Sequence, residues 1–216
     1  MFKLEDFSLQ YNSNKIIFQN VNLQIQSNKI TLLTGANGSG KTSLLRILSG
    51  LHKKYSGNII IEKQNLSACS VECLAEKVIY LKQEPHANLI AATPFEDLEI
   101  RLHKFSNTKI DESLITSALE AFEMQDFIHK PIWKLSGGQA KRIGLAALKL
   151  ANNKFWLLDE PTSGLDTKLQ NNLLEIIANH KENGALIISH RLELFSKIAD
   201  NIYEISDKKI IKLNGK

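Results

Sequence analysis

The chain has 216 residues, of which 43% are hydrophobic and 23% charged, and its formal net charge is +4 at pH 7. These values are typical of a globular protein with one domain, or one domain and a subdomain, and they exclude a disordered, collagen-like or low-complexity chain. Lysine and arginine are scattered without a block of five or more, so the positive charge does not predict a nucleic-acid partner.

The N-terminal part of the chain predicts strands of two kinds. Residues 20–25 alternate strictly between apolar and polar side chains, and together with 16–18 they indicate half-buried antiparallel strands. Residues 30–34 are almost continuously apolar, as in a strand covered on both faces. A glycine-rich segment and then a helical pattern follow this run. Further strands are predicted at 58–61 and 78–81.

Residues 82–135 differ in character and predict a mainly helical insertion. Thr93-Pro94 precedes acidic residues suited to a first helical turn, and Asp111 is suited to cap another helix. After this insertion, helices and strands alternate. The predicted elements are a helix at about 137–150, a strand at 155–158, a helix from Leu169 to Ile177, a strand at 185–188, and two edge strands at 202–205 and 210–213. Such alternation implies an α/β fold with a mostly parallel sheet.

A phosphate-binding loop is predicted immediately after the first buried strand. Gly35-Ala36-Asn37-Gly38-Ser39-Gly40-Lys41-Thr42 matches the pattern of Gly, four residues and Gly-Lys-Thr. Backbone amides and a helix N-terminus can bind an anion there, with Lys41 on the β- and γ-phosphates and the Thr42 hydroxyl on Mg²⁺. The alternative is a chance match in a turn, which the strand–loop–helix context disfavours.

Two adjacent carboxylates follow the buried strand at 155–158. Asp159 ends this strand, at the carboxyl edge of the sheet where ligands of open α/β sheets bind, and is expected to complete the magnesium site. Glu160 should point differently and is free to orient or deprotonate an attacking water. Alternatively, Asp-Glu-Pro only ends a strand with solvated acids, because Pro161 stops sheet pairing.

A second candidate anion site opens the helix at 137–150. In Leu135-Ser136-Gly137-Gly138-Gln139, Ser136 can cap the helix while the two glycines expose backbone amides. A capped turn is the structural alternative. The chain then has two anion sites and one lysine-bearing loop, which suggests that this segment completes a nucleotide site on another subunit in a two-fold arrangement.

These motifs together resemble the nucleotide-binding subunit of an ATP-binding cassette (ABC) transporter, over nearly the whole chain. Leu135–Gln139 is identical to the signature motif of that family. The resemblance implies that Tyr11 stacks on adenine, although a lone tyrosine usually serves packing. It further implies that Gln83 contacts Mg²⁺ and senses a membrane partner. His190 would contact the γ-phosphate, although a histidine at this position often only caps a helix.

The resemblance also implies a communication loop across a dimer, formed by Ser163, Gly164, Leu165 and Asp166. The implied ligands are ATP and Mg²⁺. The complete ATP-binding set is Tyr11, Gly35, Ala36, Asn37, Gly38, Ser39, Gly40, Lys41, Thr42, Ser43, Gln83 and Asp159, with Thr42, Gln83 and Asp159 on the metal. Glu160 and His190 are the catalytic candidates. Because none of these positions is degraded, active ATP hydrolysis is expected.

The implied fold is a P-loop NTPase core with an N-terminal antiparallel β subdomain and a helical insertion. The expected division is a core of 1–82 and 150–216 and an insertion of about 83–149 that carries the signature motif. No apolar run approaches membrane-spanning length, and the acidic N-terminus is not that of a signal peptide. A soluble cytoplasmic protein is therefore expected, peripheral on the inner face of the cell membrane. Its implied partners are integral-membrane transporter subunits and a second cassette, identical or paralogous.

The segment from Gln83 to Leu98 resembles, loosely, that of energy-coupling-factor ATPases, which power vitamin, cobalt or nickel uptake. It departs from their pattern at Pro94 and at His86-Ala87-Asn88. The alternatives are another short cassette, such as a haem-export or lipoprotein-release ATPase, and a soluble cassette protein acting on nucleic acid. The last usually needs two cassettes or a coiled-coil insertion, so no nucleic acid is expected.

Two cysteines, Cys69 and Cys73, exclude a disulfide framework and indicate a reducing compartment. They are four residues apart and could share a helix face. Two such ligands without a nearby histidine pair do not make a zinc site. They are interpreted as buried or incidental thiols.

Overall fold

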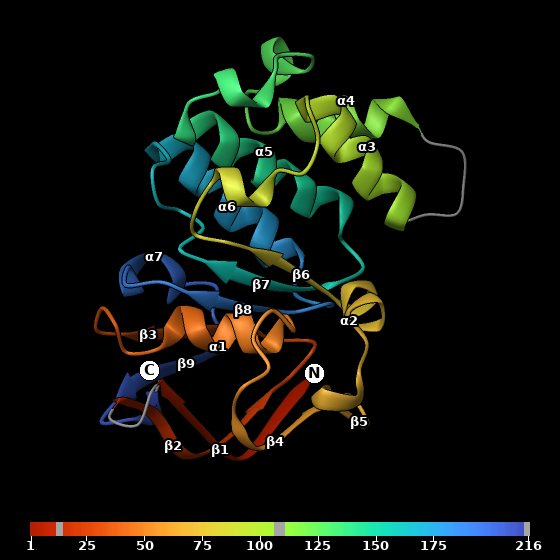
Figure 1. Cartoon of the computed structure of the whole chain (residues 1–216). Coiled ribbons are helices and arrows are strands. Elements are labelled where there is room, and N and C mark those ends of the chain that lie inside the picture. Colours follow the sequence, from red (N-terminus) through yellow and green to blue (C-terminus); the bar gives the residue numbers. More distant parts are fainter. Residues whose placement is uncertain (12–14, 106–110, 214–216) are drawn as a thin grey trace. The chain divides into compact units, whose positions relative to one another are not determined.

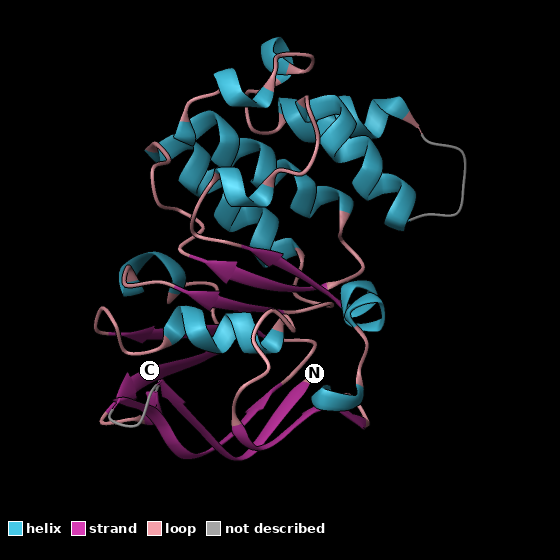
Figure 2. Cartoon of the chain, viewed as in Figure 1, coloured by secondary structure: helices cyan, strands magenta, loops and turns pink. Residues whose placement is uncertain are grey.

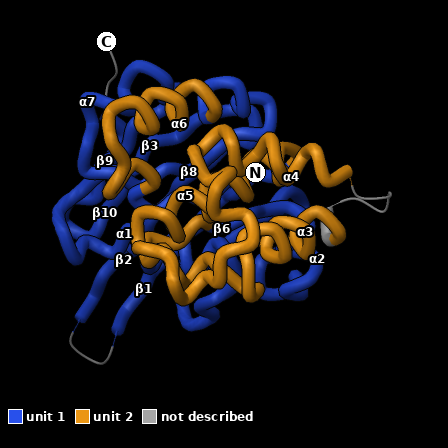
Figure 3. Tube along the Cα trace, turned by 90° about the horizontal axis from the view of Figure 1, so that it is seen from above, with its two compact units in different colours: residues 1–80, 154–160, 177–216 blue, residues 81–153, 161–176 orange. Residues whose placement is uncertain are grey.

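The computed structural model describes residues 1–11, 15–105 and 111–213. The chain divides into two compact units (Figure 3). Unit 1 comprises residues 1–80, 154–160 and 177–216, and unit 2 comprises residues 81–153 and 161–176. Residues 161–176 therefore group with the central segment.

Unit 1 contains a four-stranded antiparallel sheet in the order β2-β1-β4-β5 (Figure 1). Its strands are β1 (Phe2–Tyr11), β2 (Lys15–Ile25), β4 (Ser56–Ile61) and β5 (Gln64–Asn65). The alternation predicted for 20–25 is confirmed, since Val21, Leu23 and Ile25 are buried. One face of this sheet therefore lies in the core while the other bears polar side chains. The two segments predicted at 16–18 and 20–25 form one continuous strand, β2.

A six-stranded sheet has the order β10-β9-β3-β8-β7-β6. Its strands are β3 (Ile30–Gly35), β6 (Val78–Leu81), β7 (Phe155–Asp159), β8 (Ala185–Ile188), β9 (Asn201–Ser206) and β10 (Lys209–Leu213). Strand β3 pairs in parallel with β8 and β9, and β8 pairs in parallel with β7. Every residue of β7 and β8 is buried, as their continuous apolar runs predict.

The prediction of two C-terminal edge strands is wrong for the first of them. Strand β9 pairs with β3 on one side and antiparallel with β10 on the other, so only β10 lies at the edge. The sequence pattern of β9 does not predict an interior strand, because Tyr203 and Glu204 interrupt its apolar residues. Its position depends on pairing with a strand about 170 residues earlier in the chain.

The helices of unit 1 are short, and two of them were not predicted. They are α1 (Lys41–Leu48), α2 (Val71–Lys77), α7 (Leu192–Phe195) and the single 3₁₀ turn η1 (Leu66–Ala68). The apolar stripe of α1, which includes Leu44, Leu45 and Leu48, lies in a core shared by both sheets. Sequence periodicity missed α2 and α7 because a helix of one or two turns offers too few repeats.

The proposed helix face shared by Cys69 and Cys73 is also wrong. Cys69 follows η1 in an extended conformation, and only Cys73 belongs to α2, whose N-cap is Ser70. Both cysteines are half-buried rather than buried.

Unit 2 is mainly helical, as predicted for residues 82–135 (Figure 2). It contains α3 (Pro94–Phe105), α4 (Glu112–Glu120), α5 (Gly137–Leu150), most of α6 (Thr167–Asn179), and the 3₁₀ turns η2 (His86–Asn88), η3 (Gln125–Phe127) and η4 (Ile132–Lys134). Helix α5 packs against α3 and α4 and is almost wholly buried from Ala140 to Leu148. None of the helices in the described part of the chain has the length and hydropathy needed to span a membrane.

Candidate nucleotide-binding site

The segment from Gly35 to Thr42 joins β3 to α1 in unit 1, as the motif predicts. Gly40 is the N-cap of α1, with φ at 105°, a conformation that favours glycine. A Cβ at Gly40 would lie 2.3 Å from Cγ2 of Ile17. Strand β2, which carries Ile17, therefore restricts the backbone conformation of this loop.

Two polar groups of the loop lack an external partner. The Lys41 ammonium group donates hydrogen bonds to the loop's own carbonyls, at 2.7 Å to Gly35 and 3.0 Å to Ala36. The buried hydroxyl of Ser39 has no hydrogen-bond partner within the described ranges. Burial lowers the pKa of Lys41, and the carboxylates of Glu160 and Asp159 partly oppose this shift. A loop with a buried cation and an unsatisfied hydroxyl fits the phosphate groups of ATP.

Asp159 ends β7 at the carboxyl edge of the sheet, opposite Ile188 of β8, and is 1% exposed. The phenol of Tyr80 on β6 donates a hydrogen bond of 3.2 Å to its Oδ2. Burial, with the adjoining Asp159 carboxylate, raises the pKa of Tyr80, so its proton stays in place to orient Asp159. Sequence reasoning missed Tyr80, because nothing in its spacing distinguishes it from a packing residue.

Glu160 turns away from the strand in the left-handed region, with φ at 47°. Its Oε1 accepts a hydrogen bond from the His190 amide at 3.2 Å and lies 3.0 Å from Nδ1 of the His190 ring. Its Oε2 accepts a hydrogen bond of 3.2 Å from the Ser189 hydroxyl. The residues that follow β8 thus hold the Glu160 carboxylate. The backbone conformation of Glu160 is uncommon for a residue other than glycine. Ser189 was not singled out by sequence, although it adjoins the predicted His190.

Tyr11 lies at the end of β1, and its phenol donates a hydrogen bond of 3.2 Å to the Ser43 hydroxyl on α1. Its ring is 5.6 Å from that of His52, measured between centroids. The structure thus places Tyr11 beside the helix that follows the phosphate loop. This position is compatible with adenine stacking, which stays a prediction.

Oxygen ligands for a divalent cation are present in this unit. Thr42 and Asp159 carry the hydroxyl and carboxylate that Mg²⁺ prefers, and Mg²⁺ commonly takes its remaining ligands from phosphate and water. Among the described residues, no group of three or more histidine, cysteine or acidic side chains is placed to hold a metal ion. The residues therefore fit a cation that arrives with a nucleotide rather than one held by the protein alone.

Gln83 belongs to unit 2, where its side chain is exposed. The buried Asn88 side chain pins the surrounding loop, because it accepts from the Lys82 amide at 2.7 Å and donates to the carbonyls of Lys82 and Glu84. The sequence presents Asn88 only as a departure from a family pattern. Its role is to fix the backbone on both sides of Gln83.

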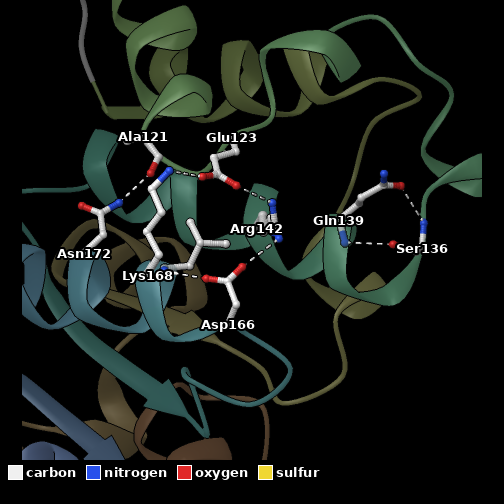
Figure 4. Close-up of polar contacts among 9 residues, drawn as sticks. Ala121, Glu123, Ser136, Gln139, Arg142, Asp166, Lys168 and Asn172 are labelled. Carbon is white, nitrogen blue, oxygen red and sulfur yellow. Dashed lines mark hydrogen bonds and ion pairs between the residues drawn. The ribbon is translucent and has the colours of Figure 1, made fainter.

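The segment Leu135–Gln139 also lies in unit 2 and opens α5. Ser136 and Gln139 form a capping box, with hydrogen bonds of 3.2 Å and 3.0 Å between each side chain and the other's amide (Figure 4). Gly137 and Gly138 are exposed. Apart from its chain neighbours and the backbone of its own helix, no described atom comes within 4 Å of a Cβ placed at Gly137. The cap predicted at Ser136 is confirmed. Both glycines lie in the first turn of α5, where backbone N–H groups have no partner within the helix.

The loop Ser163–Asp166 precedes α6, and charged side chains tie it to α5 within unit 2 (Figure 4). Asp166 caps α6 through the Leu169 amide at 2.9 Å and pairs with Arg142 at 3.5 Å. Glu123, between α4 and η3, pairs with Arg142 at 3.2 Å and with Lys168 at 2.6 Å. Arg142 thus connects the helix that carries the signature segment to the predicted communication loop. Sequence spacing shows nothing of this network, because its members are up to 45 residues apart.

Comparison with known proteins agrees with the site. Residues 18–163 match the ABC transporter family. A Listeria monocytogenes serotype 4b protein with the provisional name ABC transporter ATP-binding protein is 32% identical over 98% of this chain and 81% of its own length. A similarly named Bacillus cereus protein is 31% identical over 99% of the chain, which spans only 38% of that longer protein.

Solved structures share the fold. The cassette MJ0796, in a dimeric post-hydrolysis state bound to ADP and Pi, superposes with a TM-score of 0.87 and full coverage of both chains, at 24% identity. CbiO1 from Clostridium perfringens, part of the ABC transporter complex cbiONQ, has a TM-score of 0.76 and 26% identity over 99% of this chain and 87% of its own.

The phosphate loop, the strand-end carboxylates and the signature segment define a P-loop ATPase of the cassette class. The chain belongs to the ABC transporter family, as an ATP-binding protein that hydrolyses ATP.

Proposed function

We propose that this chain is the ATPase subunit of a membrane transporter, and that two such cassettes close around ATP to drive a solute through separate membrane subunits. The observation that carries this proposal is the phosphate loop of unit 1. The Lys41 ammonium group donates hydrogen bonds to carbonyls of the loop itself, and the Ser39 hydroxyl has no hydrogen-bond partner among the described residues. The chain itself offers no membrane-spanning helix within its described ranges. Integral-membrane partners, with the cassette on the inner face of the cell membrane, follow from this assignment.

The residue roles proposed for hydrolysis rest on unit 1. Lys41 would release the Gly35 and Ala36 carbonyls and bind the β- and γ-phosphates, while Thr42 and Asp159 would hold Mg²⁺. The bound cation would neutralise charge on the phosphates. The Glu160 carboxylate would orient the attacking water and accept its proton. Three contacts with Ser189 and His190 hold that carboxylate in a fixed orientation. A fixed orientation favours proton transfer, because the carboxylate does not have to be ordered before it accepts the proton.

The proposed dimer rests on unit 2. Gly137 and Gly138 are exposed residues in the first turn of α5, behind a capping box, and backbone amides at such a position have the chemistry to bind a phosphate from outside the segment. A second copy, or a paralogous cassette, would present its nucleotide to them. The loop Ser163–Asp166 would communicate this binding across the dimer. The dimeric state of MJ0796 supports such pairing for this fold.

Micronutrient uptake, of a vitamin or a metal ion, is the proposed transport function. Its support is the similarity to CbiO1, which is part of the cbiONQ transporter complex. Affinity capture of the tagged chain from detergent-solubilised membranes tests it. We expect multi-span subunits of an uptake system to co-purify. Recovery of exporter subunits would instead favour the haem or lipoprotein alternative, and an exclusively nucleic-acid-bound fraction would contradict a transport role.

Two substitutions test the hydrolytic site. Glu160→Gln should bind ATP normally and lower the phosphate-release rate by at least about 100-fold, because the general base is lost. Lys41→Ala should weaken ATP binding itself by about tenfold or more, since a charge-assisted hydrogen bond to phosphate is removed. Binding is measured with a fluorescent ATP analogue and turnover by phosphate release. Glu182→Gln, at an exposed position, is the matched control. Normal turnover in Glu160→Gln would refute its proposed role.

A further inference from the structure

The junction between η1 and α2 in unit 1 brings together the two cysteines of the chain. Their sulfur atoms lie 3.0 Å apart, with Cys69 donating to Cys73. The Gln64 side-chain amide donates to both sulfurs, at 3.2 Å to Cys69 and 3.4 Å to Cys73. Ser70 caps α2 through the Cys73 amide at 3.1 Å, which fixes the backbone of the short segment between them. The pair is therefore held in contact by its surroundings.

The sulfur–sulfur distance indicates what chemistry the pair can perform. A disulfide has a bond of about 2.05 Å, so closure requires the sulfurs to approach by about 1 Å. A zinc ion about 2.3 Å from each thiolate in tetrahedral geometry would instead hold the sulfurs roughly 3.7 Å apart. Within the described chain, no third histidine, cysteine or acidic ligand completes such a metal site. The geometry favours a sulfur–sulfur bond over a metal bridge.

A small cavity makes Cys69 accessible to a reagent. Its volume is about 70 Å³, and Cys69 lines it together with His52, Lys53 and Ser67. This space holds several water-sized molecules, and hydrogen peroxide is not much larger than water. Burial, reinforced by the Cys73 contact, raises the pKa of the Cys69 thiol, so this thiol is mainly protonated at neutral pH. The nearby ammonium group of Lys77, which is paired with Glu62, partly opposes this shift.

We propose that Cys69 and Cys73 form a reversible redox-modification site, which a hydroperoxide converts into an intramolecular disulfide. In the first step, one thiolate attacks the peroxide; the O–O bond breaks, water or an alcohol leaves, and the cysteine becomes a sulfenic acid. In the second step, the other thiol attacks that sulfur, the S–O bond breaks, and water leaves as the S–S bond forms. Two electrons pass from the dithiol to the peroxide. A small thiol reverses the reaction by exchange. This site is separate from the hydrolytic site and does not depend on the proposed function.

The experiment exposes the folded chain of 216 residues to hydrogen peroxide and follows both thiols. Because Cys69 and Cys73 are its only cysteines, intact mass and thiol alkylation report on this pair alone. We expect a monomer lighter by about 2 Da that takes up no alkylating reagent, and full recovery of two reactive thiols after dithiothreitol. The rate should rise with pH, because deprotonation of Cys69 supplies more thiolate.

The single variants Cys69→Ser and Cys73→Ser are the matched controls. Each should stay alkylatable or oxidise to a sulfenic acid about 16 Da heavier, without the loss of mass seen in the parent. Closure should be about tenfold faster in the folded chain than in guanidinium, because the fold holds the sulfurs together. Equal rates in the two states, retention of both thiols under peroxide, or only intermolecular disulfides would overturn the proposal. ATP turnover of the reduced chain, measured in parallel, reports separately on the hydrolytic site.

Discussion

One glycine-containing segment lies at the start of α1 and another at the start of α5, and their glycines have different roles. The phosphate loop has Gly40 in a left-handed conformation against Ile17 and Phe18, where no side chain fits. In the signature segment, Gly138 takes part in the first turn of α5, where a Cβ would meet only the Ser136 hydroxyl at 3.9 Å. Glycine at position 40 is therefore required by the fold, whereas glycine at position 138 is not. On the proposed function, glycine at position 138 leaves room for the nucleotide of a second cassette.

The strongest test of this comparison is Gly40→Ala. The added methyl group meets the side chains of Ile17 and Phe18, and the alanine must keep the positive φ of Gly40. We therefore expect the free energy of unfolding to fall by about 3 kcal/mol. Urea unfolding followed by circular dichroism measures this. Gly38→Ala is the control for backbone strain alone, because Gly38 has φ at 79° with no described atom within 4 Å of its Cβ position. An equal loss in both variants would show that packing against Ile17 contributes nothing.

A second prediction concerns how acid acts on unit 1. The His180 ring stacks on Trp156 at 3.5 Å between centroids, and its Nε2 contacts the Lys154 carbonyl at 2.8 Å. Burial lowers the pKa of His180 to about 4, so the folded chain holds this ring neutral at a pH where the unfolded chain protonates it. The stabilisation is therefore complete above pH about 6.5 and is lost as the pH falls towards 4.

We expect this loss to be on the order of 2 kcal/mol. The measurement is the free energy of unfolding between pH 4 and pH 7. His180→Gln should flatten the pH dependence, and His103→Gln, at an exposed position, should not. If the parent and His180→Gln show the same acid slope, another group is responsible.

The complementary test of the signature segment is Gly138→Ala. Alanine favours the helical first turn, so the unfolding free energy should stay constant or rise by up to about 1 kcal/mol. ATP hydrolysis should nevertheless fall, because a methyl group would obstruct a nucleotide approaching the exposed amides. Stability and phosphate release are measured on one preparation. Unimpaired hydrolysis at unchanged stability would mean that nothing binds closely at this glycine.

The smallest effect on stability is expected for Glu123→Gly. Glu123 has φ at 57°, so glycine relieves backbone strain while two ion pairs are lost, a half-buried one with Arg142 and an exposed one with Lys168. The melting temperature should stay the same or rise slightly. ATP hydrolysis should decrease if the network orients the loop at Asp166. Glu62→Gly, with the same φ and an ion pair to Lys77 in unit 1, is the matched control and should not affect hydrolysis.

Sequence reasoning succeeded where the necessary information is contiguous. The phosphate loop, the cap at Ser136 and the buried runs of β3, β7 and β8 depend on neighbouring residues, and all occur where predicted. It failed where a residue acts through a distant partner. Tyr80 contacts Asp159 from 79 residues away, and no local pattern marks it. The interior position of β9 likewise depends on pairing with β3.

The sequence by itself determined the class of this protein, because a phosphate loop and a signature segment are read from residue types at fixed short spacings. Only the tertiary structure decided how the reactive groups are held: Asp159 by Tyr80, Glu160 by the end of β8, the Gln83 loop by Asn88, and the two sulfurs in contact beside a cavity. The physical reason is that hydrogen bonds and ion pairs act over a few ångströms in space. Chain folding, rather than chain order, sets those distances.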